Sequence, residues 1–65
     1  MDQYEILLKS HIDLRRLGEY DTLECQHLPD GTTRLTGCLR DQAELFSLLS
    51  RIRDLNLTLL TVNKQ

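Results

Sequence analysis

Residues 30–62 contain, without interruption, the sequence signals of a turn, a strand, a capped amphipathic helix and a second strand. Leu28-Pro29-Asp30-Gly31 predicts the turn, because proline presets the first corner, aspartate bonds the backbone and glycine accepts a positive φ angle. Half of a 65-residue chain is thereby assigned to one compact β-α-β unit. The chain can fold only as a small α+β domain.

The helix predicted over residues 42–55 has one apolar stripe. Apolar residues recur there at steps of three and four, so that they share about a third of the circumference: Leu45, Leu48, Leu49, Ile52 and Leu55. Asp41 and Glu44 form a variant capping box at the start of the helix, and Asn56 can adopt the left-handed conformation that ends many helices. Phe46 lies at the margin of the stripe, about 100° from Leu45, where it would rim a partner surface.

Alternating apolar and polar residues predict four strands. Their ranges are 4–12, 22–28, 33–40 and 57–62. Residues 13–20 lack both alternation and helical length, so we expect a connector with room for one helical turn, in which Leu14 and Leu17 cap an open end of the core. Gly37 interrupts the third strand, which indicates a bulge or close packing of the helix above it.

The order of these elements is β-β-β-α-β, which predicts an α+β fold in a single domain over residues 1–65. Three strands in a meander run up, down and up, and a right-handed crossover through the helix then places the fourth strand beside the first and parallel to it. We therefore expect a four-stranded, mostly antiparallel sheet with the strand order 4-1-2-3 and with the helix on one face.

The predicted hairpin register separates the two cysteines. If Leu28 faces Thr32, Cys25 lies opposite Leu35 and Cys38 lies on the other face of the sheet, so a disulfide between them is excluded. A register shifted by one residue would bring both thiols to one face, but it would also split the apolar face of the hairpin. We prefer the first register, in which Cys25 is a small core residue.

The small domain and its uncovered sheet face predict self-association. An apolar core of this size only just offsets the entropy of folding, and one helix covers one face of a sheet only. The last strand is apolar on both faces, which is typical of a central strand or of one beneath a partner. We expect a homodimer, or contact with another protein, through an interface that includes Leu7, Phe46, Leu57 and Leu59.

No combination of residues specifies catalysis, a metal or a cofactor. Two thiols and two imidazoles are ligand types of a zinc site: Cys25, Cys38, His11 and His27. These residues are scattered over three strands instead of being paired in tight knuckles. The serines have no predictable base, and the three glycines do not form a phosphate-binding loop. We expect no enzyme activity, no catalytic residue, no metal and no cofactor.

The charge balance disfavours a nucleic-acid partner. Charged residues make up 28% of the chain with a net charge of −2, and acidic residues alternate with the arginines of the helix. No apolar run approaches the length of a membrane span, and the first residues do not resemble a signal peptide. We therefore expect a cytoplasmic protein that binds neither nucleic acid nor membrane.

The function that these expectations favour is a non-enzymatic interaction or assembly module that associates with itself through its sheet. A dimeric small-ligand sensor or a regulatory subunit is the alternative, because ligands commonly bind at such interfaces. A nucleic-acid binder and an enzyme are less favoured.

Four short motifs resemble those of a family of small uncharacterised bacterial and archaeal proteins. They are Gly31-Thr32, Leu35-Thr36-Gly37, Asp41-Gln42-Ala43 and Arg51-Ile52-Arg53-Asp54-Leu55. The chain differs from the pattern of that family at Phe46-Ser47, where the family often has His-Gly, and at Asn56-Leu57-Thr58, where it has Gly-Leu-Pro. The resemblance implies a fold and a small size, without an activity. Whether Phe46 replaces a functional histidine stays open.

Overall fold

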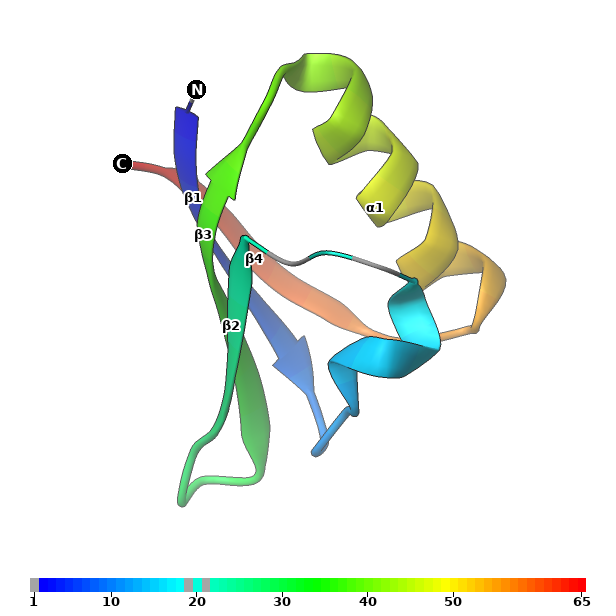
Figure 1. Cartoon of the computed structure of the whole chain (residues 1–65). Coiled ribbons are helices and arrows are strands. Elements are labelled where there is room, and N and C mark those ends of the chain that lie inside the picture. The colour runs from blue at the N-terminus through cyan, green and yellow to red at the C-terminus, as the bar shows by residue number, and fades with distance from the viewer. Residues whose placement is uncertain (1, 19, 21) are drawn as a thin grey trace.

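The computed structural model describes residues 2–18, 20 and 22–65, which form one sheet, one α-helix and a short 3-10 helix (Figure 1). In chain order the elements are β1 (Asp2–Lys9), η1 (Leu14–Leu17), β2 (Leu23–His27), β3 (Thr32–Leu39), α1 (Gln42–Asp54) and β4 (Leu59–Lys64). The predicted α+β class is confirmed, with every predicted strand and the helix close to its expected place.

The strand order is β2-β3-β1-β4, and all neighbouring strands are antiparallel. The predicted order 4-1-2-3 is wrong, because β1 pairs with β3 and β4 and not with β2. The parallel orientation predicted for β4 beside β1 is also wrong. The prediction followed the tendency of consecutive strands to pair. In the structure the connector 10–22 instead crosses the sheet to its far edge, which leaves the place beside β1 to β3.

Both crossover connections skip one strand. The connector with η1 joins β1 to β2 past β3, and α1 joins β3 to β4 past β1. This is the connectivity of the split β-α-β fold, with a 3-10 turn in the place of the first crossover helix. The single helix packs against β3 and η1. The connector therefore covers the part of the apolar sheet face that α1 does not reach (Figure 1).

The core lies between one face of the sheet and α1 with η1. Buried residues of the helix and of η1 are Leu45, Leu48, Ile52 and Leu17, and those of the strands are Tyr4, Ile6, Leu8, Leu23, Leu35 and Leu39. The predicted stripe is thus confirmed at its centre, while Leu55 at its end is exposed. The full burial of Leu17 confirms that the connector closes one end of the core.

Both ends of α1 are capped by the residues that the sequence indicated. Asp41 Oδ1 accepts a hydrogen bond from the Glu44 amide at 2.9 Å. The Glu44 carboxylate does not return to Asp41 but pairs with the Arg40 guanidinium at 2.8 Å. At the other end Asn56 has a φ of +59°, and the Leu57 amide donates to Ile52 O at 3.0 Å, as in a Schellman motif.

Replacing Asp41 by alanine is expected to destabilise the fold by about 1 kcal/mol, because the Glu44 amide loses the only acceptor that the sequence supplies at this cap. Urea unfolding followed by circular dichroism measures the change. Gln42→Ala, one residue into the helix, is the control and should leave the midpoint nearly unchanged. Equal midpoints for the Asp41 variant and the wild-type protein would contradict the assigned cap.

Thr33 fixes the connector to the sheet. This residue is fully buried in β3. Its Oγ1 accepts a hydrogen bond from the Ile12 amide at 2.8 Å and donates one to Ser10 O, also at 2.8 Å. The connector leaves β1 at Ser10, which has a positive φ of 76°, so the first strand ends earlier than predicted.

Thr33→Val is expected to destabilise the protein by roughly 2–3 kcal/mol, since valine has the same shape but leaves the buried Ile12 amide without an acceptor. Thr33→Ser, which keeps the hydroxyl, should recover part of this loss. Chemical unfolding of both variants gives the comparison. A valine variant as stable as the serine variant would show that the hydroxyl does not hold the connector.

The hairpin register is confirmed. Cys25 pairs with Leu35 and His27 with Thr33, and the Leu28 amide donates to Thr32 O at 2.8 Å. The expectation for Gly37 is wrong in both its forms, because the strand pairing is regular at this residue and its close neighbour is not the helix. A Cβ atom on Gly37 would overlap with Thr22 O, at the backbone that leads into β2.

β4 contains a bulge that the alternation of its residues did not reveal. Its pairing with β1 shifts register between Thr61, which faces Leu7, and Leu59, which faces Leu8. The bulge adds one residue to β4, so that Leu57 and Val62 both pack against the core. The strand also starts later than predicted, because Leu57 still belongs to the helix cap.

Candidate functional site

The edge strand β4 is the most exposed apolar element of the described chain. Four large apolar residues are exposed, and three of them lie at the start of this strand or shortly before it. They are Leu55 at 37%, Leu59 at 40% and Leu60 at 46%. Every residue of β4 except Val62 is classed as exposed. An edge strand of this kind can pair with another strand.

The outer backbone groups of β4 are available for such pairing. The Gln65 amide donates to Gln3 O of β1 at 2.7 Å, so Gln65 points inward. Because inward and outward groups alternate along an antiparallel strand, Asn63 and Thr61 also point inward. The N–H and C=O groups of Val62 and Lys64 then face away from the sheet, beyond the bulge and along a regular stretch of strand.

Phe46 lies on the flank of α1 away from the connector. The opposite flank, with Ser47 and Arg51, borders the connector near Gly18. Phe46 is separated from that flank by the buried stripe, and its neighbour on the helix surface is the partly buried Leu49. With 59% of its surface exposed, Phe46 confirms the prediction that it lies at the margin of the stripe.

The other edge of the sheet is polar. On β2 the exposed residues are Glu24, Cys25, Gln26 and His27. Charged and polar side chains on an edge strand disfavour pairing with a second sheet. The two edges therefore differ, and the apolar one is β4.

The uncovered face of the sheet is also polar, which corrects the reasoning behind the expected interface. Cross-strand pairs on this face join Glu5 to Thr36, Gln3 to Cys38 and Leu7 to Arg34. Leu7 is its only large apolar side chain among the described residues and is half-buried. This face does not need an apolar cover.

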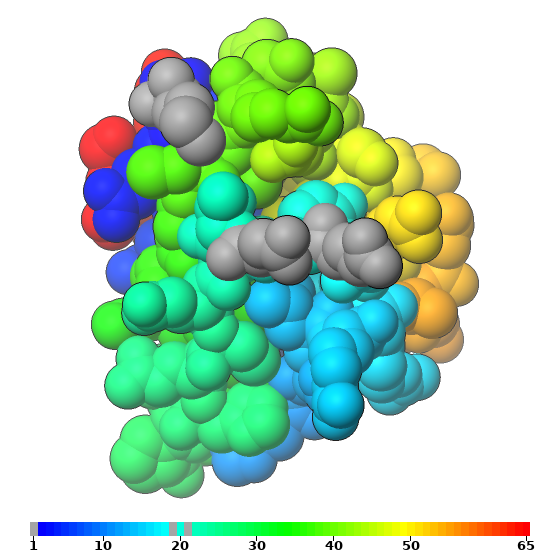
Figure 2. All heavy atoms as spheres, in the orientation of Figure 1, coloured from blue at the N-terminus to red at the C-terminus, as the bar shows by residue number. Residues whose placement is uncertain are grey.

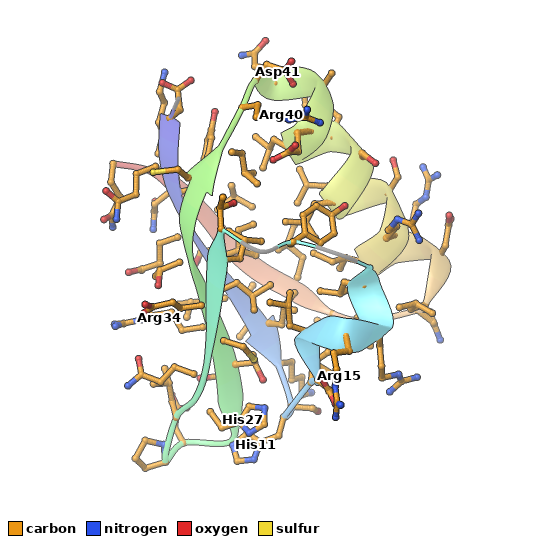
Figure 3. All side chains as sticks on the ribbon, viewed as in Figure 1. His11, Arg15, His27, Arg34, Arg40 and Asp41 are labelled. Carbon is orange, nitrogen blue, oxygen red and sulfur yellow. The ribbon has the colours of Figure 1, made fainter. Side chains whose placement is uncertain are left out.

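Arg34 occupies the middle of that polar face and points away from α1 (Figure 3). It is paired with Leu7 of β1 on one side and with Gln26 of β2 on the other. Its Nε is buried and has no hydrogen-bond partner within the described part of the chain. Sequence analysis did not single out Arg34, because its position at the centre of the sheet depends on the strand order.

The structure separates the residues predicted for the interface. Phe46 on α1 and Leu59 on β4 are exposed, whereas Leu7 lies on the polar face and Leu57 packs against the core. Leu60 was not predicted, although it is more exposed than Leu59. Strict alternation would pair Leu60 with the buried Leu8, but the bulge pairs Leu59 with Leu8 instead.

The thiols and imidazoles do not gather into one site. Cys25 and Cys38 are free thiols on opposite faces of the sheet, as the register predicted. Cys25 is exposed instead of buried in the core, and its Sγ donates to Ile12 O at 3.4 Å. No group of three or more His, Cys, Asp or Glu side chains arranged for a metal ion is found within residues 2–18, 20 and 22–65.

His11 and His27 do come together, at the end of the sheet near the β2–β3 hairpin (Figure 3). Their rings are stacked with the centroids 4.7 Å apart and an angle of 9° between the planes. The sequence places them in separate segments, so only the fold brings them into contact.

A shallow hollow of about 420 Å³ lies between the connector and the first turns of α1, on the face seen in Figure 2. Its lining residues are Gly18, Tyr20, Arg40, Asp41, Ala43, Glu44, Ser47 and Arg51. Most of these residues are polar or charged. The cluster could not be seen in the sequence, because the connector reaches this side of the helix only through the crossover.

Charges in the hollow are balanced. The hydrogen bond from Arg40 to the Glu44 carboxylate raises the pKa of the Arg40 guanidinium, so this cation already has a partner. Arg51 adds a second cation, and Asp41 caps the helix. The lining therefore presents both signs of charge to a small polar molecule.

A comparison with protein families identifies the chain. Residues 3–63 match the family described as Domain of unknown function (DUF8691). The protein belongs to this family. Membership agrees with the resemblance to small uncharacterised proteins and assigns no activity. No curated protein and no solved structure matches the DUF8691 chain.

Within the described residues of this DUF8691 protein, no helix combines the length and the apolar character that a membrane crossing requires.

Proposed function

We propose that this DUF8691 protein is a small assembly module that forms a homodimer by antiparallel pairing of two β4 strands. The observation that supports it is the outward-facing backbone of β4 beside the exposed side chains of Leu59 and Leu60. Two identical edges pair about a two-fold axis, as most homodimers are built, and the sheet continues from one copy into the other.

The charges of β4 fit pairing with itself. Outward-facing residues of antiparallel partners pair with one another, so a two-fold axis at Val62 places Lys64 of each copy opposite Leu60 of the other. Lys64 is the only charged residue of the strand, and no like charges then face each other. The aliphatic part of the lysine side chain can cover the leucine.

Phe46 extends this surface onto the helix. In a dimer with a continuous sheet, both α1 helices lie on the same side, and the flank that bears Phe46 faces the junction. The exposed ring is then covered by the second copy. The polar edge β2 and the polar sheet face stay in solvent.

Light scattering on a sizing column tests the proposal. We expect a particle of twice the 7.6 kDa chain mass at micromolar concentration, and we expect Phe46→Ser to shift the equilibrium toward the monomer without loss of helical signal. A monomer at all concentrations up to the millimolar range would refute the proposal.

A small-ligand sensor is the second candidate, and the polar hollow between α1 and the connector is the observation that favours it. A volume of about 420 Å³ lies within the range of small-molecule sites. Native mass spectrometry of the purified protein would show a bound small molecule, and Ala43→Trp, which fills the hollow, would remove it. An unliganded mass, together with no change of thermal stability on addition of a metabolite mixture, would exclude this candidate.

A further inference from the structure

The stacked histidines join the connector to the hairpin in both directions. His11 of the connector is bonded through Nε2 to Leu28 O of the hairpin at 3.0 Å. His27 of the hairpin is bonded through Nε2 to Ile12 O of the connector, also at 3.0 Å. A carbonyl oxygen can only accept, so each Nε2 donates its hydrogen.

These two hydrogen bonds survive protonation, because an imidazolium keeps its Nε2–H group. What changes is the charge of the stack. A neutral ring tolerates an imidazolium beside it, but two imidazolium ions at a centroid distance of 4.7 Å repel each other. Protonation therefore acts on the stacking contact and not on the donors.

Acidic groups of both segments face the pair. His27 is the smallest of the causes that lower the pKa of Asp13 in the connector, and His11 is the smallest of those that lower the pKa of Asp30 in the hairpin. The hydrogen bond from Arg15 lowers the pKa of the Asp13 carboxyl, and the hydrogen bond from the Thr32 hydroxyl lowers that of Asp30. Both carboxylates are therefore charged beside the stack.

Two further groups of these segments already have partners. Cys25 donates its thiol hydrogen to Ile12 O, the same oxygen that His27 uses. Arg15 is paired with Asp13 at 2.9 Å. A second proton on the stack must be added next to an existing imidazolium, 4.7 Å away between ring centroids.

We propose that His11 and His27 form a pH-sensitive clasp, which holds at most one proton while closed and which opens the connector when both rings are protonated. Opening releases residues 10–13 from the hairpin, the segment that covers the buried Thr33 hydroxyl and the end of the core. Acidification then exposes one end of the core while the rest of the sheet stays paired.

A histidine titration followed by proton NMR between pH 8 and pH 4 tests the clasp. In the wild-type protein we expect the two rings to titrate in steps about one pH unit or more apart, since the second protonation works against the first. The Ile12 amide should shift, and its hydrogen exchange accelerate, with the second step only.

His27→Gln is the matched variant, because glutamine can still donate to Ile12 O but carries no proton that titrates. His11 should then titrate in one step, at a pH above the lower step of the wild-type protein, and the Ile12 amide should not respond. His11→Gln is the reciprocal variant. Two coincident steps in the wild-type protein, or an Ile12 amide that ignores the second step, would overturn the proposal.

Discussion

Gly37→Ala is expected to leave the protein largely unfolded at room temperature. Gly37 has a φ of +152°, which side chains rarely adopt. A Cβ atom there would overlap with Thr22 O and would stand 3.0 Å from Leu23 Cα. Both neighbours are backbone atoms of the segment that leads into β2, so neither can rotate away. Strain and overlap together amount to about 3 kcal/mol or more, which is much of the stability of a domain this small.

Gly31→Ala is the matched control. Gly31 also has a positive φ, of 91°, but a Cβ atom there would meet nothing within 4 Å. Its expected cost is about 1 kcal/mol, from backbone strain alone. Thermal unfolding followed by circular dichroism compares the two variants. If the Gly37 variant melted as high as the Gly31 variant, the close approach of β2 and β3 at this point would be wrong.

Leu60→Lys is expected to weaken the proposed dimer strongly, and Leu60→Glu is expected to retain it. The variants remove the same apolar side chain at the same 46% exposed position. They differ in the charge that meets Lys64 across the two-fold axis at Val62. A lysine there faces a like charge, whereas a glutamate faces an opposite one. We expect dimer dissociation constants at least tenfold apart, or about 1.4 kcal/mol.

Sedimentation equilibrium at low ionic strength measures both constants. The double variant Leu60→Lys with Lys64→Glu should restore the dimer, because it exchanges the two charges. Gln26→Lys adds the same charge to the β2 edge and should have no effect. If lysine and glutamate at residue 60 weakened the dimer equally, the proposed pairing of residue 60 with Lys64 would be wrong. If the Gln26 variant became monomeric, the interface would lie at the β2 edge instead.

Local sequence signals sufficed for the elements with local causes. The turn at Pro29-Asp30-Gly31 fixed the hairpin register, and Asp41 and Asn56 marked both ends of the helix. These features depend on residues a few positions apart, so pattern and capping chemistry determine them.

Strand order could not be read in the same way. The connector 10–22 contains no strong helix pattern, so it resembled a link between neighbouring strands, yet it works as a crossover. What fixes the crossover is the burial of Leu17 and the two hydrogen bonds of Thr33. These contacts join residues far apart in the chain, and no local pattern encodes them.

The candidate site was only partly predictable for the same reason. Phe46 and Leu59 were correctly placed on the surface, because their exposure follows from the helix stripe and from the apolar excess of the last strand. Leu60 was missed because the bulge in β4 depends on pairing with β1. Arg34, the polar hollow and the histidine stack required the correct strand order.

Isotope-filtered NMR on a mixture of labelled and unlabelled protein tests the central claim, that two β4 strands pair with each other. We expect intermolecular NOEs between residues 60–64 of the two copies, strongest about Val62, with none from the polar face around Arg34. Intermolecular NOEs from Gln3, Glu5 or Arg34 with none from β4 would contradict the pairing of two β4 strands. A complete absence of intermolecular NOEs at millimolar concentration would also contradict it.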